Sequence, residues 1–148
     1  MNRYPFIEDI VYQKLSKIYL DTLKSNAYTH LHGCVIIISQ LALERGLNVE
    51  YARIAAILHD IATYCENCPH RIHAKQSAIM AKAILKETAL FDEAEINCIT
   101  TMIERHSHKD VIDDEMCELL KDADLLTTYY TTLTYHDSER LQKLVKLK

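Results

Sequence analysis

At 148 residues the chain is long enough for one domain with a single hydrophobic core. Its two Gly and two Pro are too few for the many tight turns of an all-β fold, so we expect an all-α protein. The formal net charge of -4, with Lys and Arg scattered along the chain, disfavours nucleic acid and anionic membranes as partners.

The N-terminal segment and the longest apolar segment show no sign of export or of a membrane span. Charged residues interrupt "MNRYPFIEDIVYQKL" throughout, unlike a signal peptide, and "CVIIISQLAL" is about half as long as a membrane-spanning helix. The five cysteines are odd in number and irregularly spaced, which fits reduced thiols better than a disulfide framework. We therefore expect a cytoplasmic protein.

Apolar residues at spacings of three and four predict six helices, followed by a short helix near the C-terminus. The predicted ranges are about 7–24, 28–45, 49–60, 73–87, 92–106 and 115–133, with the short helix after Ser138. The segments "TYCENCPHRI" and "SHKDVIDD" lack a helical period and are expected to be loops. We expect one domain over residues 1–148, a bundle of six or seven helices.

Several helix ends carry residues that favour capping. Gly46 is expected to end the second helix, Asn48 to cap the third, and the two helices to form a hairpin. Asp92 and Glu95 have the spacing of a capping box at the start of the fifth helix.

Two histidines and two aspartates far apart in the sequence form a candidate metal site. His30 lies in the second predicted helix, His59 and Asp60 end the third, and Asp124 lies within the sixth. Metal sites in helical bundles are built from side chains of different helices that project inward. A mixed nitrogen and oxygen ligand set leaves positions open for water and substrate, unlike the closed thiolate shell of a structural zinc. Catalysis at a bound metal is therefore possible.

Five sequence elements in order resemble the HD-domain metal-dependent phosphohydrolases. They are "HLHGCV", "ILHD", "HAKQSAIMAKAIL", "ERHSHKD" and "LLKDADLL", and they span about residues 28–130. The 29 residues between His30 and His59 agree with the usual spacing in that family. A His-Asp pair alone is a weak signal, whereas all five elements in an all-helical chain are a strong one.

The resemblance implies that His30, His59, Asp60 and Asp124 bind a divalent ion, which could be Mn, Fe, Co, Ni, Mg or Zn. It also implies that Asp60 can bridge to a second ion held by His73 and His106, so Asp60, His73 and His106 are the expected catalytic residues. Water activated between two ions about 3.5–4 Å apart would attack phosphorus. The implied substrate is a small phosphorylated molecule, for example a nucleotide.

Basic residues beside the histidines are candidates for binding the phosphate of the substrate. They are Arg71, Lys75, Arg105 and Lys109. Many members of the family follow the His-Asp pair with Gly and a basic residue, but this chain reads "HDIATY", which removes one phosphate contact and leaves the substrate class open.

Two doublets leave the choice of ligand open from geometry alone. Asp122 and Asp124 point about 200° apart on a helix, as do His30 and His32. The resemblance favours Asp124, and the 29-residue spacing favours His30. The other histidines, which are His32, His70, His108 and His136, are not assigned to the metal site.

Other functions remain as alternatives. The chain could be a metal- or ligand-binding HD domain without turnover, or a di-iron oxygenase of the same superfamily. Cys65, Cys68, His70 and His73 could form a zinc site, although one residue between Cys68 and His70 leaves little chain to wrap an ion. A redox Cys-X-X-Cys normally accompanies a βαβ unit, which is not expected here. The run of Tyr129, Tyr130 and Tyr135 is expected to be core or the surface of a homodimer.

Overall fold

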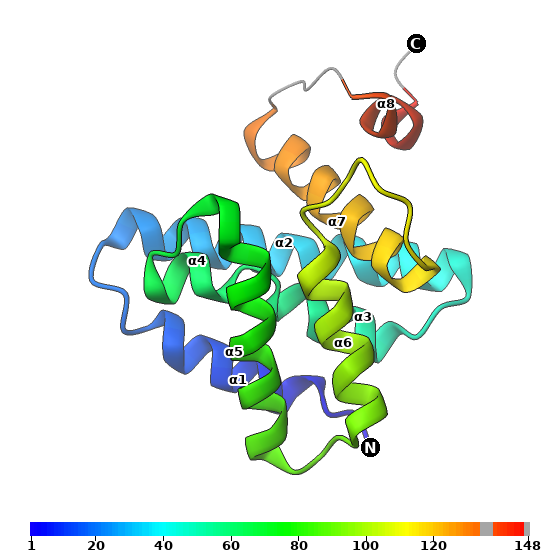
Figure 1. Cartoon of the computed structure of the whole chain (residues 1–148). Coiled ribbons are helices and arrows are strands. Elements are labelled where there is room, and N and C mark those ends of the chain that lie inside the picture. The colour runs from blue at the N-terminus through cyan, green and yellow to red at the C-terminus, as the bar shows by residue number, and fades with distance from the viewer. Residues whose placement is uncertain (134–137, 147–148) are drawn as a thin grey trace.

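The computed structural model describes residues 1–133 and 138–146, and all regular structure in these residues is helical (Figure 1). The elements are α1 (Tyr4–Leu15), α2 (Asp21–Arg45), α3 (Val49–Leu58), α4 (Ile61–Glu66), the 3-10 turn η1 (His70–Ile72), α5 (His73–Thr88), α6 (Glu93–Arg105), α7 (Glu115–Thr132) and α8 (Glu139–Val145). Apart from the six-residue α4, the described residues form seven α-helices, which confirms the expected all-α architecture.

The predicted helix over 7–24 is wrong, because the structure divides this range. Helix α1 ends at Leu15, and α2 begins at Asp21 and continues to Arg45. The Ser16 hydroxyl donates a 2.8 Å hydrogen bond to the Gln13 carbonyl oxygen, a local bond that helps to end α1. Ile18 lies in the turn between the two helices and packs against the core. It therefore has the sequence spacing of a buried helical residue although it is not in a helix.

The predicted third helix is too long, and the loop predicted after it is partly helical. Helix α3 ends at Leu58, so His59 and Asp60 lie at a junction between α3 and α4. Helix α4 continues to Glu66 and ends at Asn67, whose φ of 48° is left-handed. Elements as short as α4 and η1 are too brief to produce a detectable period.

The predicted caps are confirmed. Gly46 ends α2 with a φ of 66°, and the Asn48 side chain accepts a hydrogen bond from the Tyr51 amide at 3.0 Å. At the start of α6, the Asp92 carboxylate accepts from the Glu95 amide at 2.8 Å and the Glu95 carboxylate accepts from the Asp92 amide at 2.9 Å. These bonds fix where α2, α3 and α6 begin or end.

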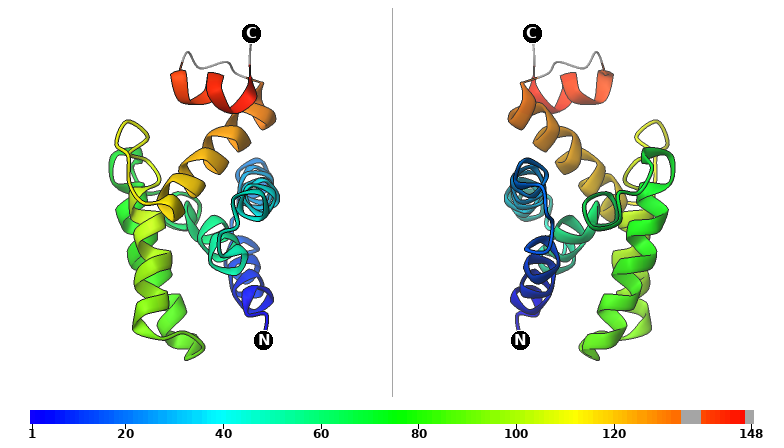
Figure 2. Two further views of the ribbon diagram at one scale, coloured as in Figure 1. Left: turned by 90° about the vertical axis from the view of Figure 1, so that its right-hand side faces the viewer. Right: turned by 90° about the vertical axis from the view of Figure 1, so that its left-hand side faces the viewer.

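Helix α3 lies at the centre of the fold, in contact with α1, α2, α6 and α7. Six of its ten residues are completely buried, because neighbouring helices cover most of its surface. The expected hairpin of α2 and α3 is present, and α5 and α6 form a second hairpin. Figure 2 shows α5 and α6 together on one side, with α1 and α2 on the other.

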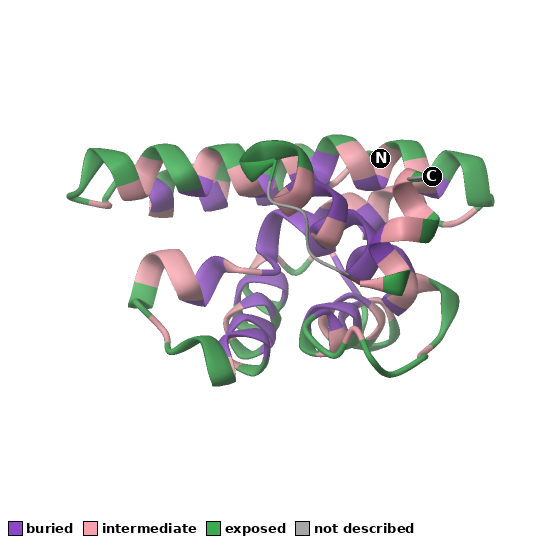
Figure 3. Cartoon of the chain, turned by 90° about the horizontal axis from the view of Figure 1, so that it is seen from above, coloured by how far each residue is buried: buried purple, intermediate pink, exposed green. Residues whose placement is uncertain are grey.

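Helix α7 crosses above α3, and α8 packs across α7, where Arg140 of α8 pairs with Glu118 and Asp122 in the first half of α7 (Figures 1 and 2). Buried residues of α2, α7 and the ends of α5 and α6 face one central region, whereas the outer face of α2 is exposed (Figure 3). Within the described ranges, no helix combines the length and the apolar character that a bilayer crossing requires. Tyr135 and His136 lie outside the described residues, and Tyr130 is exposed.

Candidate metal centre

Six side chains from six helical elements meet in the central region, and each comes from a helix end or from a buried helix face. His30 projects from α2 and Asp124 from α7, while His73 is the first residue of α5. His59 and His106 follow the last residues of α3 and α6, and Asp60 precedes α4. The residues named by the sequence analysis as metal ligands are therefore brought together.

Four of these side chains form the first group. His30 Nε2 lies 3.0 Å from His59 Nε2, 3.2 Å from Asp60 Oδ2 and 3.2 Å from Asp124 Oδ1. His59 Nε2 lies 3.4 Å from the same two carboxylate oxygens. The four ligand atoms all lie within 4.8 Å of one another, close enough to hold one metal ion.

The second group uses the other carboxylate oxygen of Asp60. Asp60 Oδ1 lies 3.3 Å from His73 Nε2 and 3.4 Å from His106 Nε2, and the two imidazole nitrogens are 3.1 Å apart. Asp60 thus presents one oxygen to each group, so the two groups share a bridging carboxylate.

Backbone carbonyls fix which nitrogen of three histidines faces the centre. The Nδ1 atom of His59 donates to the Ala56 carbonyl at 2.7 Å, and that of His106 donates to the Ile103 carbonyl at 2.6 Å. His73 Nδ1 donates to the carbonyl of His70 in the same way. Because a carbonyl oxygen only accepts, the proton of each neutral ring is on Nδ1, and Nε2 presents a lone pair to the centre.

A divalent cation fits this arrangement. The lone pairs of His73 Nε2 and His106 Nε2 face each other at 3.1 Å, which is favourable only when a positive charge lies beside both. Asp60 Oδ1 is buried and has no hydrogen-bond partner, although a buried carboxylate oxygen needs one. Imidazole nitrogen and carboxylate oxygen are ligands that suit several first-row divalent metals.

Opposite charges dominate the electrostatics of the cluster without a metal. Burial lowers the pKa of His30, but hydrogen bonds to Asp124 and Asp60 outweigh burial and raise the pKa to about 9. Burial also raises the pKa values of Asp60 and Asp124, yet the surrounding histidines hold both well below the usual range. The pKa of His106 is lowered, mainly by burial. Both carboxylates are therefore ionised and ready to act as ligands.

Comparison with known families and structures agrees with this geometry. The model of the HD domain family matches residues 27–129. The chain belongs to the HD domain family. Members of this family are usually metal-dependent hydrolases. A search among curated proteins gives no match.

One solved structure is similar over nearly the whole chain. It is the crystal structure of a predicted HD superfamily hydrolase from an uncultured Thermotogales bacterium, with a TM-score of 0.73 and 23% sequence identity. The alignment covers 97% of this chain and 83% of the other. The similarity supports the HD-domain fold.

In the HD domain, one residue of each ambiguous pair lies in the ligand cluster and the other lies outside it. His32 lies on the outer side of α2, where its Nδ1 is 2.8 Å from the Tyr12 hydroxyl. Asp122 forms ion pairs of 2.8 Å with both Arg45 and Arg140. Neither residue joins the cluster, whereas His30 and Asp124 do.

A glycine allows α2 and α7 of the HD domain to approach closely beside the cluster. A Cβ atom added to Gly33 would lie 3.2 Å from Cγ2 of Thr127. Gly33 is one turn from His30, and Thr127 is one turn from Asp124. The small residue therefore helps to bring these two side chains into contact.

The four predicted phosphate-binding residues of the HD domain have different surroundings. Lys109 Nζ lies 2.6 Å from Asp124 Oδ2 and 3.1 Å from the carbonyl oxygen of His106, so it touches the cluster. The Arg105 guanidinium donates to Asp113 at 3.0 Å. Arg71 and Lys75 are exposed, and neither has a hydrogen-bond or ion-pair partner among residues 1–133 and 138–146.

The alternative cysteine site is not assembled in the HD domain. In the described part of the chain, no group of potential metal ligands contains a cysteine. His73, which that site would need, belongs to the second group, and His70 stacks on the His73 ring at a centroid distance of 4.7 Å. His108 is exposed.

Sequence reasoning missed one aromatic neighbour of the site. The Tyr64 ring lies one turn after Asp60 in α4, with its centroid 6.5 Å from that of His30. Burial raises the pKa of Tyr64. The spacing of four residues from Asp60 could have indicated this position.

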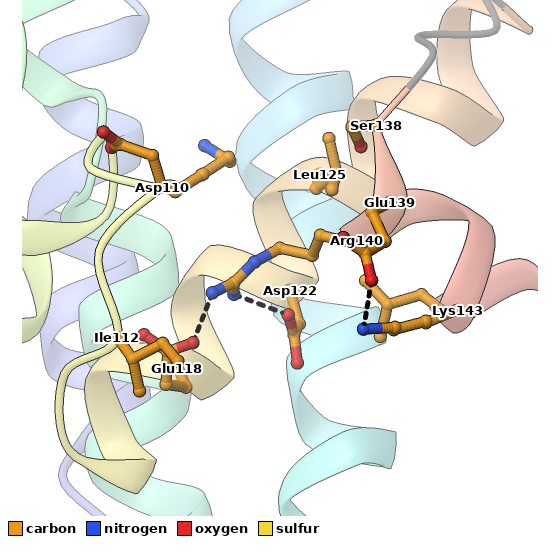
Figure 4. A pocket seen from close by; sticks show the side chains of 11 residues that line it. Asp110, Ile112, Glu118, Asp122, Leu125, Ser138, Glu139, Arg140 and Lys143 are labelled. Atoms are coloured by element: carbon orange, nitrogen blue, oxygen red, sulfur yellow. Dashed lines mark hydrogen bonds and ion pairs between the residues drawn. The ribbon is translucent and has the colours of Figure 1, made fainter.

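A cavity of about 700 Å³ adjoins the site between α7, α8 and the loop after α6 (Figure 4). Arg140 forms ion pairs there with Glu118 and Asp122, and Lys143 pairs with Glu139 at 2.7 Å. Lys109, the third cationic residue that lines this cavity, forms an ion pair with Asp124. These cations are all neutralised by carboxylates, so the cavity lacks a free charge for an anionic group among the described side chains.

Proposed function

We propose that this HD domain is a metal-dependent phosphohydrolase that cleaves a phosphoester of a small molecule such as a nucleotide. One observation carries the proposal: the two oxygens of Asp60 face two separate groups of metal ligands. A bridging carboxylate between two ligand groups suits two neighbouring ions, and dinuclear sites of this kind are common in enzymes that transfer phosphoryl groups. Membership of a family of mostly metal-dependent hydrolases supports the same reaction class.

In this proposal the two groups have related roles. His30, His59, Asp60 Oδ2 and Asp124 Oδ1 would hold one ion, and Asp60 Oδ1, His73 and His106 would hold the other. Divalent ions supply an acidified water as nucleophile and a Lewis acid for the phosphoryl oxygens. The carbonyl bonds of His59, His73 and His106 keep their Nε2 atoms directed at the ions, so no reorientation is needed before reaction.

Lys109 is the cation whose position best supports a contact with the phosphate. Its ammonium group orients Asp124 and lies at the edge of the ligand cluster, where it can also donate to a phosphoryl oxygen. Arg71 lies two residues before His73 and remains a proposed phosphate ligand, as do Lys75 and Arg105. To bind a phosphate, Arg105 would first have to break its ion pair with Asp113.

Elemental analysis of the purified protein tests the metal site. We expect up to two divalent ions per chain in wild type, loss of metal in Asp60→Ala, and unchanged metal in Cys65→Ser. Circular dichroism should show that Asp60→Ala keeps its helical content. The proposal is wrong if Asp60→Ala retains both metal and phosphatase activity, or if Cys65→Ser alone loses the ion.

Turnover of a panel of phosphoesters by the metal-loaded protein tests the reaction. We expect hydrolysis of at least one small phosphoester by wild type and none by Asp60→Ala. Bound metal without turnover of any ester would favour a ligand-binding HD domain. Two iron ions per chain with a charge-transfer absorption band, and no ester hydrolysis, would favour an oxygenase.

A further inference from the structure

A second cavity, of about 810 Å³, lies between the end of α1, the first half of α2 and α4. Helix α4 packs against both α1 and α2, as Figure 1 shows. Tyr64 lines this cavity, and the same ring lies 6.5 Å from the ring of His30. Tyr64 therefore lies beside both the cavity and the candidate metal centre.

The position of Leu23 on α2 gives the distance between the cavity and the cluster along this helix. Leu23 lines it and precedes His30 by seven residues, which is two turns of the same face and about 10 Å along the helix. Tyr64 follows Asp60 by one turn and lines the cavity from α4. A separation of about 10 Å between His30 and Leu23 matches the non-phosphate part of a nucleotide-sized molecule better than that of a very small ester.

The walls combine aromatic and aliphatic side chains with unpaired positive charge. Tyr19, Leu20 and Tyr64 are among the lining residues, and Tyr19 is 94% exposed. Lys14 and Lys17 also line the cavity, and in the described residues neither ammonium group has a hydrogen-bond or ion-pair partner. Glu66 is the acidic residue among the lining residues. In contrast, the cations around the cavity at α8 are paired with carboxylates.

We propose that this cavity binds the leaving group of the substrate and that the substrate carries a planar ring and a second anionic group. The ring would lie against Tyr19 and Tyr64, and the second anion would be bound by Lys14 and Lys17. This inference rests on the proposed phosphohydrolase function, because the first phosphate would be held at the metal centre. It assigns the substrate to the class of phosphorylated ring compounds with two separated negative groups.

The first experiment compares two substrates that differ in the second anion. Adenosine 5′-monophosphate and adenosine 3′,5′-bisphosphate are tested with the metal-loaded wild type, Lys14→Gln/Lys17→Gln and the control Lys82→Gln. Lys82 is an exposed lysine of α5 away from the cavity. We expect the ratio of kcat/KM values, bisphosphate over monophosphate, to fall about tenfold or more in the double variant. The ratio should not change in the control, and an unchanged ratio in the double variant overturns the inference.

A second experiment does not depend on turnover and uses Cys65 as a reporter. Cys65 lines the cavity and is not in a disulfide, and Cys98 on α6 serves as an internal reference. The bisphosphonate analogue of adenosine 3′,5′-bisphosphate, which resists hydrolysis, is added to the metal-loaded protein at about ten times its Kd. Alkylation of Cys65 by iodoacetamide should slow about tenfold, and alkylation of Cys98 should not change. Protection should disappear in Lys14→Gln/Lys17→Gln.

The two experiments separate failure of the inference from failure of the proposed function. Protection of Cys65 without hydrolysis of any phosphoester would support the cavity and contradict the phosphohydrolase. Hydrolysis with no protection of Cys65 and an unchanged substrate ratio would contradict the cavity and leave the phosphohydrolase intact.

Discussion

Lys109 Nζ lies 2.6 Å from Oδ2 of Asp124, while Oδ1 of the same carboxylate faces His30 Nε2 at 3.2 Å. The lysine therefore fixes which oxygen of Asp124 is presented to the candidate metal site. Because Lys109 also binds the His106 carbonyl, it connects residues of both ligand groups.

Replacement of Lys109 by Met should lower activity and spare metal binding. The ligands of the first group remain, but the oriented carboxylate and one contact to the phosphate are lost, at a cost of about 1.5–3 kcal/mol. We expect kcat/KM for a small phosphoester to fall about 10- to 100-fold, with metal content at or above the wild-type level. Lys82→Met is the matched control. Wild-type activity in Lys109→Met would remove this lysine from the mechanism.

His30→Ala and His32→Ala form a matched pair on opposite faces of one helix. Replacing a residue that only hydrogen-bonds to a metal ligand typically weakens metal binding about 10- to 100-fold. His30 is a proposed direct ligand, so its removal should weaken metal binding by more than this. His32 contacts Tyr12 on the outer side of α2, and its removal should leave metal content unchanged. Elemental analysis after dialysis measures both. The reverse order of effects would mean that the helix is rotated in the active protein.

Lys121 should be important for stability, because it is fully buried with three acceptors. Its ammonium donates to the Val111 carbonyl at 2.6 Å and to Asp113 and Glu118 at 2.7 Å each. These bonds connect α7 to the loop that carries Lys109. Lys121→Met leaves the acceptors without this donor and should reduce the free energy of unfolding by about 2–3 kcal/mol.

Urea denaturation measures this loss, with exposed Lys82→Met as the control, expected within about 0.5 kcal/mol of wild type. A wild-type midpoint for Lys121→Met would show that the arginines beside Asp113 and Glu118 replace the lysine.

Arg3 and Glu50 should make stability depend on acidic pH. The Arg3 guanidinium lies 2.6 Å from Glu50 Oε2, and its hydrogen bonds lower the pKa of Glu50. Because the folded pKa is below the unfolded value of about 4.3, the stabilisation is complete above that value. It is lost as pH falls through the lowered folded pKa.

Thermal unfolding of wild type and Glu50→Gln between neutral and acidic pH tests this sign. The wild type should have the higher Tm at neutral pH, and the difference should shrink as the solution is acidified. Glu87→Gln, an exposed control on α5, should follow wild type at every pH. A difference that grows at low pH would contradict the assignment.

The sequence alone determined the helical class, several helix ends and the order of the candidate ligands. Capping residues such as Asn48 and Asp92 act through bonds to amides three residues away, so their effect is local and can be predicted from spacing. Helix α5 begins and ends within one residue of its predicted range, because its apolar spacing is regular. The resemblance to the HD-domain proteins named the six residues that the structure brings together.

Only the tertiary structure decided how these residues face one another. Helical periodicity shows that His30 and His32 point apart, but not which of them meets α7. The division between Asp60 Oδ1 and Oδ2, the contact of Lys109 with Asp124 and the position of Tyr64 all depend on the packing of separate helices. The turn between α1 and α2 could not be predicted from the spacing of apolar residues, because Ile18 packs against the core without being in a helix. Sequence spacing reports the faces of one helix, whereas the site is formed where the faces of several helices meet.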